Sequence, residues 1–300
     1  MQFYNSYRSY LKRRFGGPVL KVALNGGFSC PNRDGSKSSG GCTFCDNRSF
    51  STAVLSSESV VNQFTSAIHR SSKRFRHYLP YLQPYSNTYG SVRQLEQMYE
   101  PLINVPGSVG LAIGTRPDCF NEEIYQYLGE LSKRSYLSVE LGLQSGHDSV
   151  LQKVNRGHSV DQFVYAAERL SSYGIEVVAH LILGLPGESG EMMEQTARKI
   201  GSMDSVAGVK IHQLMIIAGT EMEKSFQRGE IDLLSLEEYT EQLCRFLCSI
   251  NPHQHVHRIM ADSKVELGLI APLWSTEKTG SISYIHEYMR KTGFVQGFRS

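Results

Sequence analysis

The sequence predicts an α/β protein built on a mainly parallel sheet. Short apolar runs rich in Val, Ile and Leu alternate with longer stretches whose apolar residues recur with helical spacing, which is typical of repeated β–α units. The strand-like runs are 19–24, 109–113, 137–143, 175–183 and 206–217. A weaker run at 78–83 contains Pro80 and is followed by Pro84, and proline donates no hydrogen bond to a sheet.

The stretches between these runs predict amphipathic helices, because their apolar residues fall three or four positions apart. The clearest are 60–68, 120–131, 160–170 and 236–247. Successive β–α units joined by right-handed crossovers give a parallel sheet. Six units fit between residues 19 and 250, a number that either an open six-unit barrel or a doubly wound sheet satisfies. We therefore expect a basic segment at 1–18, a core at 19–250 and a C-terminal extension at 251–300 that packs on the core.

Composition indicates an ordinary folded protein. Hydrophobic residues make up 40% of the chain and charged residues 20%, with a formal net charge of +2. That net charge is too small to indicate a nucleic-acid partner by itself. Two basic runs, 8–14 and 70–77, are either solvated charge at helix ends or contacts for phosphate groups.

The chain contains no apolar stretch near the ~20 residues that a membrane helix needs. Residues 1–17 are polar and basic and lack the apolar region of a secretory signal. We therefore expect a cytoplasmic protein with no membrane association. In that reducing compartment its six cysteines are metal ligands or buried thiols rather than disulfides.

Three cysteines form the most informative motif. Cys30, Cys42 and Cys45 follow the first predicted strand with the spacing C-x11-C-x2-C. Thiolates are the ligands that zinc and iron–sulfur clusters prefer, and the spacing alone leaves both open. Because a structural zinc ion takes four protein ligands, three cysteines at the carboxyl end of a strand favour a site with one open position.

The other three cysteines lie far along the chain. Cys119 follows the 109–113 strand and is expected to be a buried thiol. Cys244 and Cys248 are four residues apart on the apolar face of a predicted helix, which favours core packing.

Eight motifs in a fixed order carry a resemblance to a known family. They are Cys-Pro-Asn-Arg-Asp-Gly (30–35), Gly-Gly-Cys-Thr-Phe-Cys (40–45), Tyr-Ser-Asn-Thr-Tyr (85–89), Gly-Thr-Arg-Pro-Asp (114–118), Glu-Leu-Gly-Leu-Gln-Ser (140–145), Asn-Arg-Gly-His (155–158), His-Leu-Ile-Leu-Gly-Leu-Pro-Gly-Glu (180–188) and Lys-Ile-His-Gln-Leu (210–214). Together they resemble the radical S-adenosylmethionine (SAM) proteins of the YhcC/YtqA type. These are relatives of the Elongator catalytic subunit and of oxygen-independent coproporphyrinogen oxidase.

This resemblance implies a partial (β/α)6 barrel of the TIM type. It also implies a [4Fe–4S] cluster whose three irons are bound by Cys30, Cys42 and Cys45 and whose fourth iron binds SAM. Reductive cleavage of SAM then gives a 5′-deoxyadenosyl radical, and a low-potential electron donor such as flavodoxin or ferredoxin is implied. The long gap between the first two cysteines departs from the commonest C-x3-C-x2-C spacing of radical SAM proteins but resembles this branch.

The resemblance also implies roles for residues at the strand ends. The expected SAM-binding residues are Phe44, Ser86, Asn87, Thr88, Glu140, Gln144, Arg156 and His180. The Gly-Gly that usually receives the SAM amino group is absent near 86–88. The expected catalytic residues are His180, Lys210 and His212, the last two on one face of a strand because they alternate. Arg116 and Asp118 are expected either to contact substrate or transfer protons, or to form a structural ion pair.

Three functions remain open from the sequence. The preferred one is a radical SAM enzyme that modifies a tRNA base, with the side chain of the wobble uridine as the favoured target and tRNA as a candidate partner. The second is the same chemistry on a small molecule. The third is a non-catalytic nucleic-acid-binding module stabilised by zinc.

Overall fold

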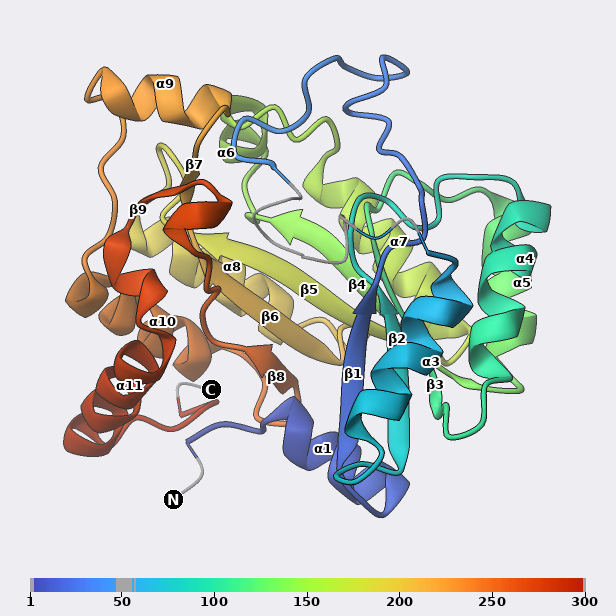
Figure 1. The fold of residues 1–300 in the computed structure, drawn as a ribbon. Helices are drawn as coiled ribbons and strands as arrows, with labels where there is room; N and C mark the ends of the chain where they lie inside the picture. Colours follow the sequence, from blue (N-terminus) through green and yellow to red (C-terminus); the bar gives the residue numbers. More distant parts are fainter. Residues whose placement is uncertain (1–2, 47–55, 57, 299–300) are drawn as a thin grey trace.

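The computed structural model describes residues 3–46, 56 and 58–298. One parallel sheet of seven strands forms its centre, in the order β1-β2-β3-β4-β5-β6-β8, and it curls into a half-barrel (Figure 1). The strands are β1 (Val19–Leu24), β2 (His77–Leu82), β3 (Gly110–Thr115), β4 (Tyr136–Gln144), β5 (Glu176–Leu183), β6 (Gly208–Gln213) and β8 (His255–Arg258). The predicted fold class, a partial barrel of β–α units, is confirmed.

The helices lie around the outside of the curled sheet (Figure 1). They are α1 (Tyr7–Phe15), α3 (Val60–Ser71), α4 (Val92–Ile103), α5 (Glu122–Ser132), α6 (Asp148–Lys153), α7 (Val160–Ser172), α8 (Gly190–Gly201), α9 (Glu221–Gln227), α10 (Leu236–Ser249) and α11 (Lys278–Thr292). Serine caps start several of them: Ser91, Ser159 and Ser235 each form a complete capping box. Each predicted amphipathic helix therefore forms, with its apolar face on the sheet.

Proline shapes the second strand. Tyr78–Leu82 enters the sheet despite Pro80, which lies opposite Val22 of β1. On the other side, the β2–β3 ladder is confined to Tyr81 and Leu82. The break falls where Pro80 has no N–H to donate, so the strand is retained at the cost of part of one ladder.

The seventh strand comes from the segment expected to be a C-terminal extension. β8 pairs in parallel with β6 and makes up one edge of the sheet. The predicted strand at 206–217 divides in two: β6 ends at Gln213, and the two-residue β7 (Ile216–Ile217) pairs antiparallel with β9 (Leu269–Ala271). Between Asn251 and the end of the described chain, α11 then packs against α10.

Helix α1 spans the two free edges of the sheet, β1 and β8. It packs on both strands, and the amide of Val256 donates to the carbonyl of Asn5 just before the helix (2.8 Å). The ring of Tyr7 stacks on His257 with 3.5 Å between centroids. The amino ends of the two edge strands are therefore bridged, while the side between them stays open higher up (Figure 1).

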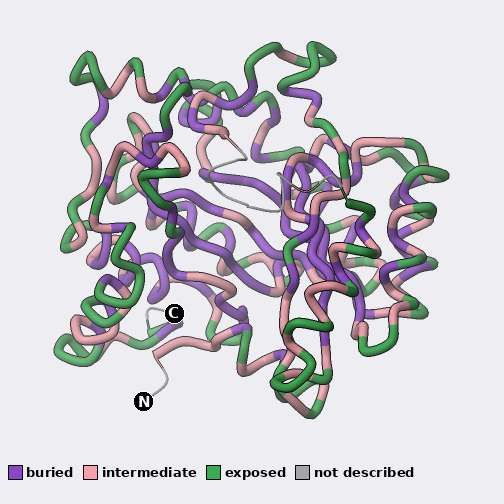
Figure 2. Tube along the Cα trace, viewed as in Figure 1, coloured by how far each residue is buried: buried purple, intermediate pink, exposed green. Residues whose placement is uncertain are grey.

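The core follows the sheet. Strands β3, β4 and β6 are buried along their whole length, and Figure 2 shows buried residues concentrated on the central strands. Cys244 and Cys248 are buried on α10, as predicted. No helix in the described part of the chain is both long and apolar enough to cross a membrane.

Candidate active site

A pocket that is partly open to solvent lies at the carboxyl ends of the strands. It is lined by residues from the loop after β1 and from the ends of β2 to β6. The predicted site residues that line it are Cys30, Cys42, Phe44, Cys45, Ser86, Glu140, Gln144, Arg156, His180, Lys210 and His212. Asn87 and Thr88 do not line it. The topology of the sheet therefore brings together residues that are spread over 183 positions of the sequence.

The loop after β1 folds into two tight turns that carry the cysteines. The amide of Arg33 donates to the carbonyl of Cys30 (2.8 Å), and the amide of Cys45 donates to that of Cys42 (3.0 Å). The loop is tied to the rest of the barrel through Thr43, whose amide donates to the carbonyl of Val154 (3.1 Å). These bonds hold all three thiol groups on the wall of one pocket.

The cysteine side chains are surrounded by N–H donors. Cys42 Sγ accepts from Arg156 Nη1 (3.4 Å) and from Asn32 Nδ2 (3.6 Å). Burial raises the pKa of the Cys45 thiol to about 12, and the neighbouring Cys42 adds to the rise while Arg33 opposes it. The thiolate of Cys45 therefore needs a nearby cation, and binding a metal there would release a proton.

The residues present fit the expected [4Fe–4S] cluster in donor type and in their surroundings. Three thiols share one pocket wall, and two buried guanidinium groups stand beside them. Among residues 3–46, 56 and 58–298, no three His, Cys, Asp or Glu side chains are placed to hold a single metal ion. A [4Fe–4S] cluster does not require the three side chains to meet at one ion, because each cysteine thiolate binds its own iron.

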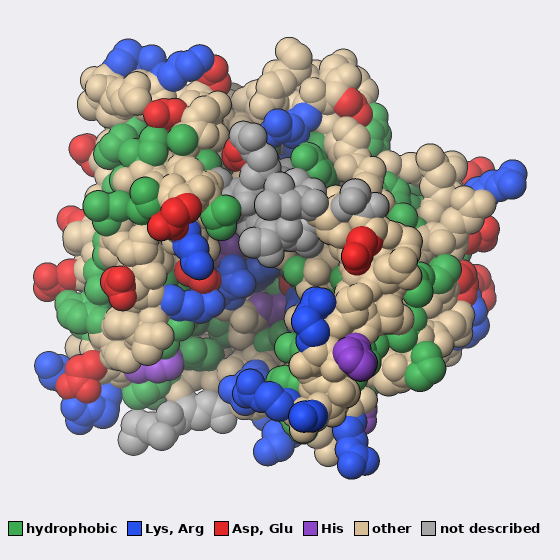
Figure 3. Space-filling model, viewed as in Figure 1, with side chains coloured by type: hydrophobic (Ala, Val, Ile, Leu, Met, Phe, Trp, Pro, Cys, Tyr) green, Lys and Arg blue, Asp and Glu red, His purple; other side chains and the backbone are tan. Residues whose placement is uncertain are grey.

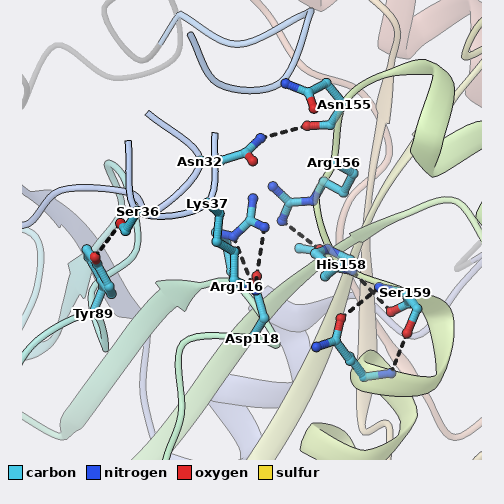
Figure 4. A network of polar contacts seen from close by, with 12 residues as sticks. Asn32, Ser36, Lys37, Tyr89, Arg116, Asp118, Asn155, Arg156, His158 and Ser159 are labelled. Atoms are coloured by element: carbon cyan, nitrogen blue, oxygen red, sulfur yellow. Dashed lines mark hydrogen bonds and ion pairs between the residues drawn. The ribbon is translucent and has the colours of Figure 1, made fainter. Parts of the chain in front are cut away.

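Arg116 and Asp118 form a buried, two-pronged ion pair next to the cysteine loop (Figure 4). Arg116 donates to Asp118 through Nε and Nη2, both at 2.9 Å, and Lys37 contacts the same carboxylate. Burial opposes ionisation of Asp118, but its bonds with Arg116 outweigh this and lower its pKa to about 2. The Nη1 of Arg116 is buried and has no hydrogen-bond partner in the described structure.

The Asn-Arg-Gly-His motif at 155–158 packs on the cysteine loop. Asn155 Nδ2 donates to the carbonyl of Gly41 (2.8 Å), and Asn32 Nδ2 donates to the carbonyl of Asn155 (2.6 Å). Asn155 and Gly157 both have left-handed backbone, with φ of 49° and 73°. A Cβ on Gly157 would lie 2.7 Å from Asn32 Oδ1, so glycine is required for this close approach.

Arg156 and His158 of this motif meet at the end of β4. Arg156 Nη2 donates to the carbonyl of Gly142 (2.7 Å), and His158 Nε2 lies 2.9 Å from the same oxygen. Burial, together with Arg156 and Arg116, lowers the pKa of His158 to about 3, so the ring is neutral. Figure 4 shows the guanidinium groups of Arg116 and Arg156 turned toward the same space below the cysteine loop.

Residues 86–88 serve the loop after β2 in different ways. Ser86 lines the pocket. Asn87 instead points into the fold, where its Nδ2 donates to the carbonyls of Leu82, Pro84 and Gly114. Thr88 Oγ1 lies 2.7 Å from Thr115 Oγ1 and donates to the carbonyl of Cys119 (2.7 Å). The side chains of Asn87 and Thr88 therefore fix the strand ends from behind the pocket.

Gln144 and Phe44 frame the middle of the pocket. Gln144 ends β4 with a left-handed φ of 77°, next to a register shift in the β4–β5 ladder. Its Oε1 is buried and has no partner in the described structure. Phe44 belongs to an apolar cluster that includes Val154 and Ile182. The pocket thus joins one apolar wall to a wall of polar groups.

The floor of the pocket is a buried charge cluster centred on Glu140. Its carboxylate contacts Lys21 and accepts from Lys210 Nζ (2.8 Å) and Tyr81 Oη (2.5 Å). His257 Nδ1 lies 3.4 Å away. Burial opposes ionisation of Glu140, but Lys21 and Lys210 outweigh it and hold its pKa well below the usual range. The carboxylate is therefore ionised and already ion-paired within the protein.

The candidate catalytic side chains lie just above this floor. Burial lowers the pKa of Lys210 to about 8, against the opposing effect of Glu140. His180 Nε2 lies 3.2 Å from His212 Nδ1. Burial, aided by Lys210, lowers the pKa of His180 to about 3, and burial with His180 lowers that of His212 well below its usual value. Both imidazoles are neutral near pH 7, whereas Lys210 holds a proton that it can release.

Several residues of the site were not expected from the sequence. Lys21, Tyr81 and His257 complete the charged floor, and Asn32 contacts the cysteine loop. Asn32 lies within a motif that carries the resemblance, so its position was available as a signal. Lys21 is a single cation within the apolar run 19–24, and His257 lies on a strand of four residues that is too short and too polar for an apolar pattern to predict.

Comparison with known proteins agrees with this geometry. Residues 36–200 match the model of the radical SAM superfamily, and 206–291 match the radical SAM C-terminal domain. The chain is 38% identical to protein YtqA of Bacillus subtilis over 98% of its own length and 92% of that protein.

Two further similarities lie outside that group. A tRNA uridine(34) acetyltransferase of Methanocaldococcus infernus is 32% identical over 62% of this chain and 34% of that protein. The solved structure of an N-terminally truncated Elp3 from the same organism has a TM-score of 0.70 at 21% identity, covering 93% of this chain and 64% of that one.

The family match spans most of the sheet and includes Cys42 and Cys45, and the YtqA match spans nearly the whole chain. The solved structure shows the same fold. The chain therefore belongs to the radical SAM superfamily, and it is an enzyme that works with a [4Fe–4S] cluster and S-adenosylmethionine.

Proposed function

We propose that this radical SAM enzyme modifies a base of tRNA, and that its preferred target is the side chain of the wobble uridine. The observation that carries the proposal is the pocket itself, in which three thiols, two buried arginines and the Lys210–Glu140 floor lie at the same end of the sheet. The substrate class is supported by the similarity to a tRNA uridine(34) acetyltransferase. Because the chain matches 34% of that protein, the acetyl transfer named for it is not carried over.

In this proposal Cys30, Cys42 and Cys45 hold the cluster. Arg156 and Asn32 donate to Cys42 Sγ, and such hydrogen bonds orient a cysteine that binds iron and tune the cluster. When bound, the cluster and SAM supply a 5′-deoxyadenosyl radical that removes a hydrogen atom from the substrate.

The SAM-binding groups proposed here are polar atoms that the protein leaves free. Arg156 Nε and Gln144 Oε1 are buried and have no hydrogen-bond partner in the described structure. A guanidinium N–H suits a carboxylate, and an amide oxygen suits an ammonium or hydroxyl group. Phe44 contributes an apolar surface for the adenine, with Ser86 and His180 as further polar contacts. For Asn87 and Thr88 the proposal is limited to placing the backbone, since their side chains bond inside the fold.

Glu140 is proposed to act through Lys210 rather than on SAM. Its carboxylate is paired with Lys21 and Lys210. Lys210, with a pKa of about 8, can give a proton to the substrate or take one from it near neutral pH. His212 Nε2 is buried without a partner in the described structure and lines the pocket, so it is placed to hydrogen-bond the substrate.

The first test is anaerobic reconstitution with iron, sulfide, SAM and dithionite, followed by measurement of 5′-deoxyadenosine. We expect a brown protein that releases 5′-deoxyadenosine and methionine. Cys30→Ala, Cys42→Ala and Cys45→Ala should each lose the colour and the product. Cys244→Ala makes the same change outside the pocket and should keep both. Retention of the cluster in any of the three pocket variants would contradict the assignment of its ligands.

The second test concerns the substrate. Deletion of the gene should remove one modified nucleoside from total tRNA digests analysed by mass spectrometry, or replace it by a form with a shorter side chain. The wild-type gene should restore it, and the Cys42→Ala gene should not. An unchanged nucleoside profile would overturn the tRNA proposal while leaving the radical SAM assignment intact.

A further inference from the structure

Positive charge is segregated in the first part of this chain. Residues 1–33 and 59–95 contain eleven of the 31 Lys and Arg residues and none of the 29 Asp and Glu residues. The rest of the chain is left with an excess of acid. A nearly neutral protein therefore has one strongly basic region and an acidic remainder, a distribution that its net charge of +2 conceals.

The two basic runs of the sequence meet at one place in the fold. Helix α1 leads into β1, and the segment after α3 leads into β2, and these strands pair in parallel with Val19 opposite His77. Gly17 lies against the ring of His77, where an added Cβ would be 3.3 Å from Nδ1. The runs 8–14 and 70–77 therefore lie side by side at the amino ends of β1 and β2.

The charges on this surface are exposed, and apart from Arg14, which pairs with Glu176, they have no acidic partners in the described structure. Within the part of the chain that the structure describes, no ion pair to a carboxylate is formed by Arg8, Lys12, Arg13, Arg70, Lys73, Arg74 or Arg76, all of which are exposed. Elsewhere exposed cations are commonly paired, as in Arg198–Glu194, Lys224–Glu221 and Arg290–Glu287. Among the described residues these unpaired cations form no ion pair that stabilises the fold, so they are available to an external anion.

The basic side chains of α1 are held on a fixed support. Ser6 caps the helix, Tyr7 and Leu11 are buried beneath it, and the Tyr7 ring stacks on His257. The opposite side of the helix presents Arg8 and Lys12 to solvent. Because the helix is anchored, binding through these charges requires little further ordering of the backbone.

The same face of the molecule is hollowed above this surface. In Figure 3, Lys and Arg side chains gather low on the face, over α1 and the lower ends of β1 and α3, where no Asp or Glu is visible. Above them is the hollow on the open side of the sheet, with Lys, Arg and His side chains inside it. A six-residue strand such as β1 spans roughly 20 Å, which sets the distance from the basic surface to the strand ends that carry the pocket.

We infer that α1 and the segment 70–77 form a surface that binds the phosphate backbone of the RNA substrate while one of its bases reaches the pocket. This inference rests on the proposed function and adds where the RNA lies. Unpaired Arg and Lys on a rigid support suit a polyanion with closely spaced charges. None of the exposed large hydrophobic residues belongs to 8–14 or 70–77, and the density of unpaired positive charge is what favours a polyanion here.

The test compares two triple variants that each lose three exposed positive charges. The first is Arg8→Gln, Lys12→Gln and Arg13→Gln on α1. The control is Arg198→Gln, Lys224→Gln and Arg290→Gln, whose side chains are 56%, 62% and 62% exposed and paired with Glu. Glutamine keeps helix propensity close to that of Lys and Arg. Binding of an unmodified tRNA transcript to the reconstituted protein is measured by fluorescence anisotropy from 50 to 300 mM salt.

The α1 variant should bind RNA at least tenfold more weakly at low salt, and its slope of log K against log salt should be shallower by about 2 to 3, or roughly one for each lost phosphate contact. Arg70→Gln, Lys73→Gln and Arg74→Gln together should act in the same direction. The control should keep the wild-type slope. SAM cleavage without RNA should be unchanged in every variant, which shows that the site is still folded.

Each other outcome has a separate meaning. Equal weakening in the α1 variant and the control would overturn this surface while leaving RNA as the substrate. Absence of RNA binding by the wild-type protein at any salt concentration would remove the proposed function itself. Binding to vesicles with 30% anionic lipid instead of tRNA, lost in the α1 variant and kept in the control, would assign the surface to a membrane and overturn the inference.

Discussion

Glu140 Oε2 lies 2.8 Å from Lys210 Nζ, and the same carboxylate also contacts Lys21. One anion therefore serves two cations, the half-buried Lys21 of the first strand and the buried Lys210 of the sixth. Tyr81 and His257 add contacts from two further strands. The floor of the pocket thus depends on a single carboxylate.

Substitution of Glu140 by Gln should destabilise the protein strongly, by about 3–5 kcal/mol, because it leaves the buried Lys210 and the half-buried Lys21 without an anion. Lys210→Met should cost less, since Glu140 keeps Lys21 as its partner. The measurement is the thermal midpoint of the anaerobically purified proteins at one pH. Equal midpoints for the two variants would show that the carboxylate does not organise this cluster.

Glu188 should make stability depend on pH. Burial raises its pKa to about 7, although Ser145 Oγ donates to its Oε1 (2.5 Å). An unfolded glutamate titrates near pH ~4.3, so the folded protein binds the proton more tightly than the unfolded chain. Stability is then lost as pH rises from about 4.3 through 7.

Glu188→Gln should therefore raise the thermal midpoint at pH 8, where the wild-type carboxylate is charged and buried. At pH 4.5 the same substitution should change it little, because the folded wild type is then protonated. A gain of equal size at both pH values would show that the effect is one of packing and not of titration.

Much of the fold could be predicted from the sequence because it depends on local patterns. Buried strands such as β3 and β5 are continuous apolar runs, and the helices between them have a clear apolar spacing. Strand β8 could not be found in this way, since its four residues are His-Val-His-Arg and only tertiary pairing with β6 makes them a strand.

The candidate site divides along the same line. Cys42 and Cys45 are close in sequence, and motif order placed Gln144 and Arg156 after the fourth strand. Glu140 and Lys210 were expected in the site, but their pairing with Lys21 and His257 into one floor could not be predicted, because the four residues come from four different strands. Their contacts depend on register and on the curl of the sheet. Asn87 and Thr88 were expected in the pocket, but their side chains bond inside the fold. A position in a motif does not reveal which way a side chain points.

Gly110 should not tolerate any side chain. Its φ is 151°, and a Cβ would lie 2.2 Å from the carbonyl oxygen of Tyr136 on the neighbouring strand. Gly110→Ala must push β3 and β4 apart and should lower the thermal midpoint strongly. Gly280→Ala is the control, because Gly280 lies on helix α11 and an added Cβ would be 4.0 Å from the Cβ of Glu277, which is ordinary contact. It should be neutral or stabilise by up to ~1 kcal/mol. Similar effects of the two substitutions would contradict the close approach of β3 to Tyr136.

We expect the ring of Tyr7 to hold helix α1 against the sheet. Its ring is buried and stacks on His257, while its Oη lies 3.3 Å from Tyr136 Oη. Tyr136 also donates to Glu176 (2.6 Å), so Tyr7→Phe leaves no buried hydroxyl without a partner and should cost ~1 kcal/mol or less. Tyr7→Ala removes the ring and should cost about 3–5 kcal/mol. Loss of the ring should also free α1 locally, so that limited trypsin digestion cuts after Lys12, Arg13 or Arg14 much faster in Tyr7→Ala than in Tyr7→Phe. Equal resistance of the two variants would mean that the pairing of Asn5 with Val256 holds the helix without the stacked ring.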